Sequence, residues 1–85
     1  MEEHNPRLKA AILEAVENQL RAGDPPETRE TLARLIAEGH SEADAKILLG
    51  QAVAVEIYCT LKEKKPFNRD RFVRNLNALP AQPHE

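Results

Sequence analysis

Apolar residues recur along this chain at intervals of three and four, the spacing that places side chains on one side of an α-helix. Three segments show a single apolar stripe. These stripes are Leu8, Ile12, Leu13, Val16 and Leu20; Thr28, Leu32, Leu35 and Ile36; and Phe72, Val73, Leu76 and Leu79. No segment alternates between apolar and polar residues with a period of two, so no β-strand is expected.

Residues that start and stop helices set the expected bounds. Asn5-Pro6 combines an N-cap residue with proline at the first helical position, and Gly23 is suited to a left-handed C-cap. Ser41 precedes Asp44 by three residues, as in a capping box. The predicted helices cover residues 6–22, 26–38, 42–64 and 69–79, and residues 80–85 are expected to form a flexible tail.

The third segment differs from the others because its apolar residues point in almost every direction between Ile47 and Leu61. A helix that is apolar on all sides is typical of one packed by several neighbours. The fold class predicted is therefore all-α, a compact single-domain bundle of about four helices around one long central helix. Its expected core positions are Leu48, Leu49, Ala52, Val53, Val55, Ile57 and Tyr58.

The segment between the last two predicted helices contains several ordering features. Pro66 prevents the long helix from continuing, and Asn68 is an N-cap candidate. Phe67 precedes this cap and Phe72 follows it at the spacing of a hydrophobic staple. We therefore expect a rigid turn here.

Composition restricts the protein class. Of the 85 residues, 41% are hydrophobic and 31% are charged, with a formal net charge of −2. The longest uncharged run through the middle of the chain, residues 47–55, is about half of what a bilayer helix needs. The first residues are acidic and no apolar segment of a signal peptide follows them. The single cysteine fits a reducing compartment. We expect a cytoplasmic protein without membrane association.

Residues suited to catalysis or metal binding are not grouped in the sequence. His4, His40 and His84 lie far apart and none is at helical spacing from a second ligand. Cys59 lies on the apolar side of the long helix, where a thiol usually serves as a small apolar side chain. The sequence therefore predicts no catalytic residue, no metal site and no cofactor, and the protein is expected not to be an enzyme.

Two polar residues interrupt apolar faces. Gln19 falls within the apolar arc of the first helix, and Glu56 is the only charged residue between Ile47 and Leu61. Such a carboxylate lies either in a seam that solvent reaches or in the interior with a partner. Both residues are candidate buried polar groups.

The strongest surface feature is a basic segment. Residues 62–74 contain six cationic and two acidic side chains, a local net charge of +4 on an acidic chain. Cations at a helix start are disfavoured by the helix dipole, which makes Arg69 and Arg71 unusual. The candidate partner-binding residues are Lys62, Lys64, Lys65, Arg69, Arg71 and Arg74. They could bind an acidic protein surface or RNA phosphates, or could form an ordinary solvated turn.

Several short motifs, spread over nearly the whole chain, form a combined pattern. They are Asn5-Pro6, Glu17-Asn18-Gln19-Leu20, Thr31-Leu32-Ala33-Arg34-Leu35, Glu38-Gly39, Ala45 and Glu56-Ile57-Tyr58. The pattern resembles a family of small bacterial all-helical proteins of unknown function. Members often carry a histidine after the Asn-Pro pair and a His-Glu-x-x-His-like stretch at the start of the long helix. This chain has Lys9 and residues 43–47 there instead, so the resemblance implies a helical fold and no metal function.

These observations favour a non-enzymatic module that acts through a protein partner or as a homodimer. A thin, alanine-rich core gains stability from a second hydrophobic contact. The alternative is a nucleic-acid-associated accessory protein that uses the basic segment, with weak and strongly salt-dependent binding.

Overall fold

The computed structural model describes residues 6–83, which form four helices and no strand. Helix α1 spans Pro6–Ala22, α2 Pro26–Ala37, α3 Glu42–Glu63 and α4 Arg69–Ala78. The all-α prediction is confirmed. Ser41 and Asn68 cap α3 and α4 as predicted, whereas α2 begins after Pro25 without a side-chain cap. Asn5, the expected cap of α1, and the histidines at positions 4 and 84 lie outside the described residues.

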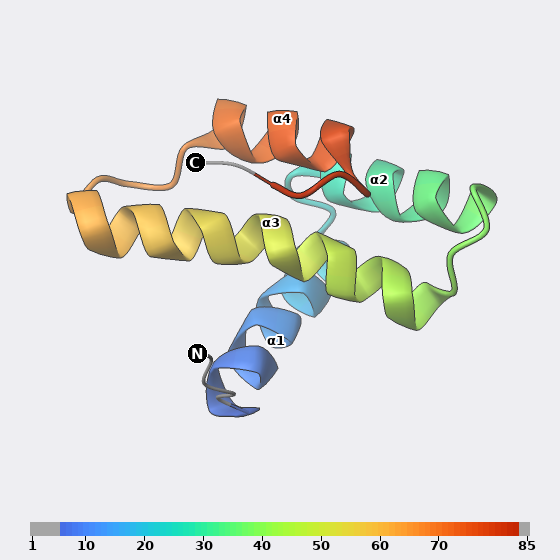
Figure 1. The fold of residues 1–85 in the computed structure, drawn as a ribbon, viewed down its shortest axis with the longest axis horizontal. Helices are drawn as coiled ribbons and strands as arrows, with labels where there is room; N and C mark the ends of the chain where they lie inside the picture. Colours follow the sequence, from blue (N-terminus) through green and yellow to red (C-terminus); the bar gives the residue numbers. More distant parts are fainter. Residues whose placement is uncertain (1–5, 84–85) are drawn as a thin grey trace.

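Helix α3 contacts each of the other three helices. In Figure 1, α2 and α4 lie on one side of α3, while α1 crosses the other side at a steep angle. Short loops between helices favour neighbours packed roughly antiparallel, and α1 departs from that arrangement. Its close approach depends on Gly50, where an added Cβ would lie 3.1 Å from a methyl carbon of Ile12.

The core between the helices is small, and its side chains have almost no contact with solvent. Side chains from all four helices are fully or almost fully buried in it: Val16, Leu35, Ala45, Leu49, Ala52, Val53, Phe72, Leu76 and Leu79. Alanine occupies two of these positions on α3, which allows the neighbouring helices to pack close to its axis. Burial of these apolar surfaces is the main favourable contribution to folding.

The expectation that α3 is surrounded on all sides is only partly correct. Leu49, Ala52 and Val53 are buried, while Leu48, Val55 and Ile57 are partly buried. Tyr58, expected in the core, is 52% exposed, so that prediction is wrong. Three neighbours contact α3, but they do not cover its whole circumference, and one face of this 22-residue helix remains exposed.

Residues 80–83, the described part of the segment predicted to be a flexible tail, lie beside α3, and the rest of it lies outside the described residues. The Ala81 N–H donates to the Ala78 carbonyl at 2.9 Å, and Pro83 is buried. Together with Leu48 and Val55, Pro83 borders an open hollow of about 610 Å³. Figure 1 shows this segment running back beside α4. Proline rings supply apolar contact area that the sequence analysis did not assign to this segment.

Candidate interaction surface

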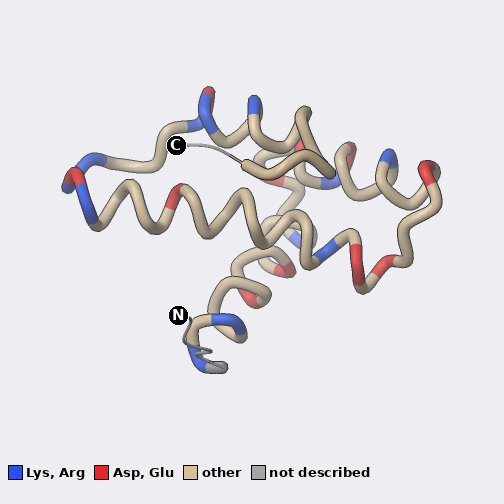
Figure 2. Tube along the Cα trace, in the orientation of Figure 1, with Lys and Arg blue, Asp and Glu red and all other residues tan. Residues whose placement is uncertain are grey.

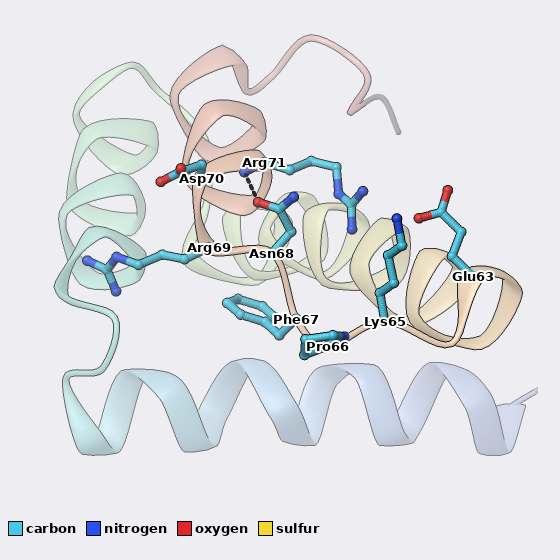
Figure 3. Close-up of a pocket in the computed structure, with 8 residues that line it drawn as sticks. All are labelled: Glu63, Lys65, Pro66, Phe67, Asn68, Arg69, Asp70 and Arg71. Atoms are coloured by element: carbon cyan, nitrogen blue, oxygen red, sulfur yellow. Dashed lines mark hydrogen bonds between the residues drawn. The ribbon is translucent and has the colours of Figure 1, made fainter.

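The basic segment forms an ordered turn between α3 and α4. Lys64 ends α3 in the left-handed conformation with φ of 56°, and its N–H donates to the Thr60 carbonyl at 2.8 Å. The Phe67 and Phe72 rings pack with centroids 5.2 Å apart, which confirms the predicted staple. The Asn68 Oδ1 accepts a hydrogen bond from the Arg71 N–H at 3.0 Å, as Figure 3 shows, so Asn68 caps α4.

Glu56 is buried and has partners from the start of α4. Its side chain accepts hydrogen bonds from Arg71 Nε at 2.6 Å and Arg71 Nη2 at 3.0 Å. Its Oε1 also accepts from the Asn68 N–H at 3.0 Å. The residue is only 2% exposed. Of the two environments proposed from the sequence, the interior with a partner is correct. The same contact explains why an arginine occurs in the first turn of α4.

The ionisation of this pair follows from its geometry. Burial raises the pKa of Glu56. The hydrogen bonds from Arg71 and Asn68, together with the positive charge of Arg71, lower it by a larger amount, so the pKa lies below its ordinary value. The hydrogen bond to Glu56 raises the pKa of Arg71. Both groups are therefore charged in the folded protein near neutral pH, and the pair connects α3 to α4.

Arg69 forms a second, more exposed ion pair. Its Nη2 lies 2.9 and 3.1 Å from the two carboxylate oxygens of Glu27, which is in the first turn of α2. This contact joins the starts of α2 and α4. Exposed pairs of this kind contribute at most about 1 kcal/mol. Like Arg71, Arg69 is engaged within the molecule.

The six candidate cations therefore do not form one uniform surface. Arg71 is mostly buried and Arg69 is paired, while Lys64, Lys65 and Arg74 are exposed. Lys62 is also exposed and lies over the Tyr58 ring, with Nζ 5.5 Å from the centroid. Figure 2 shows the cationic residues of the turn mixed with acidic ones. An open hollow of about 580 Å³ beside the turn is lined by both kinds, including Glu63 and Asp70.

Gln19, the other candidate polar residue, is partly buried and binds a neighbouring helix. The Thr28 hydroxyl donates to Gln19 Oε1 at 3.0 Å, joining α1 to α2. Thr28 is fully buried and Thr31 nearly so. Thr28 lies on the apolar stripe predicted for α2, but its hydrogen bond could not be predicted, because nine residues and a loop separate it from Gln19.

An exposed stripe on α3 was not anticipated. Ile47, Tyr58 and Leu61 are 44%, 52% and 74% exposed, respectively. Exposed Gln51 and partly buried Ala54, which also border the hollow beside Pro83, complete the stripe. We call it the α3 stripe: Ile47, Gln51, Ala54, Tyr58 and Leu61. The intervals of four, three, four and three residues are those of helices that pack lengthwise against another helix. This spacing is present in the sequence, but it could not be distinguished there because α3 has apolar residues in nearly every direction.

A small apolar hollow adjoins the C-terminal end of this stripe. It has a volume of about 270 Å³ and lies where Ile57 and Leu61 of α3 meet Ala15 of α1 and the Phe67 ring. Phe67 is half exposed. Exposed apolar surface thus continues from the stripe to the turn, and large contiguous patches of this kind typically mark interaction sites.

Comparisons with known proteins return no relative. No family model, no curated protein and no solved structure matches the chain. Residues 6–83 contain no group of three or more histidine, cysteine, aspartate or glutamate side chains that could hold a metal ion. None of the described helices combines the length and apolar character needed to cross a bilayer.

Proposed function

We propose that this protein is a non-enzymatic, cytoplasmic module that acts by binding another protein chain through the α3 stripe. The observation that carries the proposal is the exposure of Ile47, Tyr58 and Leu61 on one face of a 22-residue helix. Exposing large apolar side chains to water is unfavourable, and a partner that covers them recovers that free energy. Tyrosine is also among the residue types enriched at protein interfaces.

The position of Glu56 supports binding over catalysis. A buried carboxylate with a shifted pKa is a common component of active sites. Here both carboxylate oxygens accept hydrogen bonds from the start of α4, and the pKa is lowered. A lowered pKa makes the carboxylate a weaker base, and its role in joining α3 to α4 accounts for its burial.

Nucleic-acid binding by the basic segment has less support. Arg69 and Arg71 are held by Glu27 and Glu56, which neutralise part of the local charge. RNA binding would have to depend on the exposed cations Lys64, Lys65 and Arg74, together with Lys62 beside the Tyr58 ring. Salt-dependent RNA binding that the Lys64→Glu, Lys65→Glu, Arg74→Glu triple variant abolishes would favour this alternative. These substitutions leave the Glu56–Arg71 pair intact.

Site-specific photo-crosslinking in cells tests the proposed function. A benzophenone amino acid is placed at Tyr58 in one strain and at Ile36 in another. Ile36 is a matched control because it is 43% exposed and lies on α2. We expect a protein adduct at position 58 that is absent at position 36, with its identity given by mass spectrometry. Equal adduct patterns at both positions would contradict the proposal.

A further inference from the structure

We infer that the occupant of the α3 stripe is a second copy of this chain, whose own α3 lies antiparallel to the first. This inference rests on the proposed function and adds the partner, its orientation and its register. It is drawn from the symmetry of the stripe, from the charges that flank it and from the length of the helix.

The stripe is nearly symmetric about Ala54: Ile47 and Leu61 each lie seven residues from it, whereas Gln51 lies three residues before it and Tyr58 four after it. In an antiparallel pair with its twofold axis at Ala54, Ile47 meets Leu61 of the second copy, and Gln51 lies within one residue of the position opposite Tyr58. Ala54 then faces its own equivalent, and its small side chain permits close approach of the two helices at the centre. The Tyr58 hydroxyl and the Gln51 amide can hydrogen-bond across the contact, which favours this register over shifted ones.

The charges flanking the stripe favour the antiparallel orientation. Asp44 and Lys62 are both exposed and lie 18 residues apart, five turns of helix, so they flank the same side of the stripe. The 5.5 Å contact of Lys62 with the Tyr58 ring places this cation beside the stripe. Antiparallel pairing brings Asp44 of each copy near Lys62 of the other, because these residues lie ten and eight residues from Ala54, whereas in a parallel pair the two copies of each residue lie on opposite sides of the contact and form no such pairs. The helix dipoles also oppose each other in the antiparallel arrangement.

The length of the contact indicates a reversible dimer. Helix α3 is about 33 Å long at 1.5 Å per residue, and the whole molecule measures 35 × 27 × 24 Å. A single helix pair of this length lies at or below the lower end of the interface sizes seen in specific complexes, about 1,200 Å². We therefore expect dimerisation in the micromolar range, dependent on protein concentration.

Sedimentation of the purified full chain measures this equilibrium. Between about 5 and 500 µM, we expect the apparent mass to rise from 9.6 kDa towards twice that value. Ile47→Arg should keep the chain monomeric, while Ile36→Arg should dimerise like the wild type. This comparison is closely matched, because the two isoleucines are 44% and 43% exposed. A wild-type chain that stays monomeric throughout, or a dimer unaffected by Ile47→Arg, would overturn the inference.

A charge exchange tests the orientation. Asp44→Lys places only cations on the flank, and Lys62→Asp places only anions there, so each variant alone should dimerise about tenfold more weakly. The double variant Asp44→Lys, Lys62→Asp should dimerise like the wild type, because antiparallel pairing again places opposite charges side by side. Circular dichroism checks that each variant remains helical. If the double variant dimerises as weakly as the single variants, the antiparallel register is wrong.

The two tests separate the inference from the proposed function. A monomeric chain in sedimentation, combined with a different protein crosslinked at position 58, would refute the homodimer and retain the interaction module. A monomeric chain with no specific adduct would refute both. A crosslinked adduct of twice the chain mass, together with Ile47→Arg-sensitive dimerisation, supports both.

Discussion

The two faces of α3 show the reverse of what side-chain polarity alone suggests, because a charged side chain is buried on one face and large apolar side chains are exposed on the other. The buried face includes the charged Glu56 beside small residues such as Ala45 and Ala52. The exposed face includes Ile47, Tyr58 and Leu61. The carboxylate is buried because α4 supplies an arginine and a backbone N–H to it, while the larger apolar residues have no neighbouring helix over them.

This comparison shows that burial in a small domain depends on where neighbouring elements lie, in addition to residue type. The other three helices cover only part of the circumference of α3. Alanines allow those neighbours to pack close to α3, and Ile47, Tyr58 and Leu61 remain on the side without one. The interaction surface proposed above is therefore the part of α3 that the fold leaves uncovered.

The largest effect on stability is expected from Glu56→Ala on the buried face. It removes one partner of a buried ion pair and leaves Arg71 without its carboxylate, which typically costs about 3–5 kcal/mol. Urea unfolding monitored by circular dichroism measures the free energy of unfolding, with Glu14→Ala at an exposed position of α1 as control. A loss no greater than that of the control would show that the pair contributes nothing to the folded state.

Leu49→Ala should have the next largest effect, about 2–5 kcal/mol. Leu49 is fully buried, so its truncation leaves a cavity among α3 and its neighbours. Leu48→Ala, at the adjacent and only partly buried position, should cost less when both variants are measured by urea unfolding. Equal losses would mean that the buried face extends further round α3 than the structure shows.

Acidification should weaken the connection between α3 and α4. The folded state holds the pKa of Glu56 below its ordinary value, so the unfolded chain binds its proton more readily. The resulting stability is present at pH values above the ordinary pKa and is lost as the pH falls through the lowered one. Urea unfolding between about pH 6 and pH 3 should therefore show a smaller decline for Glu56→Gln than for the wild type.

The matched control for this pH experiment is Glu30→Gln at an exposed position of α2. That variant should follow the wild-type pH dependence. If Glu56→Gln loses stability with acid as steeply as both of them, other carboxylates are responsible and the Glu56–Arg71 pair does not dominate the acid response.

The smallest effects on stability are expected on the exposed face. Tyr58→Ala and Leu61→Ala should each change the free energy of unfolding by no more than about 0.5 kcal/mol, as is usual for surface substitutions. The measurement is made at low protein concentration, where self-association contributes little. A loss of several kcal/mol would show that this face packs within the monomer, and the α3 stripe would then not be an interaction surface.

Local features of the helices could be predicted from the sequence because they depend on nearby residues. The Asn68 side chain accepts the hydrogen bond from Arg71 that an N-cap requires, and the Phe67 and Phe72 rings are in contact. Gly23 has the positive φ, 69°, that its C-cap position requires. Residues at most a few positions apart create each of these features, so helix periodicity and capping chemistry are sufficient.

The tertiary structure alone decided which side chains are covered and which charges are paired. Arg71 reaches Glu56 across 15 residues, and Arg69 reaches Glu27 across 42. The sequence indicated that Arg69 and Arg71 were unusual and that Glu56 required an explanation, but it did not connect them. It also could not show that Tyr58 is exposed, because α3 carries apolar residues in nearly every direction. Such contacts depend on how helices approach one another in space, which periodicity within a single helix does not specify.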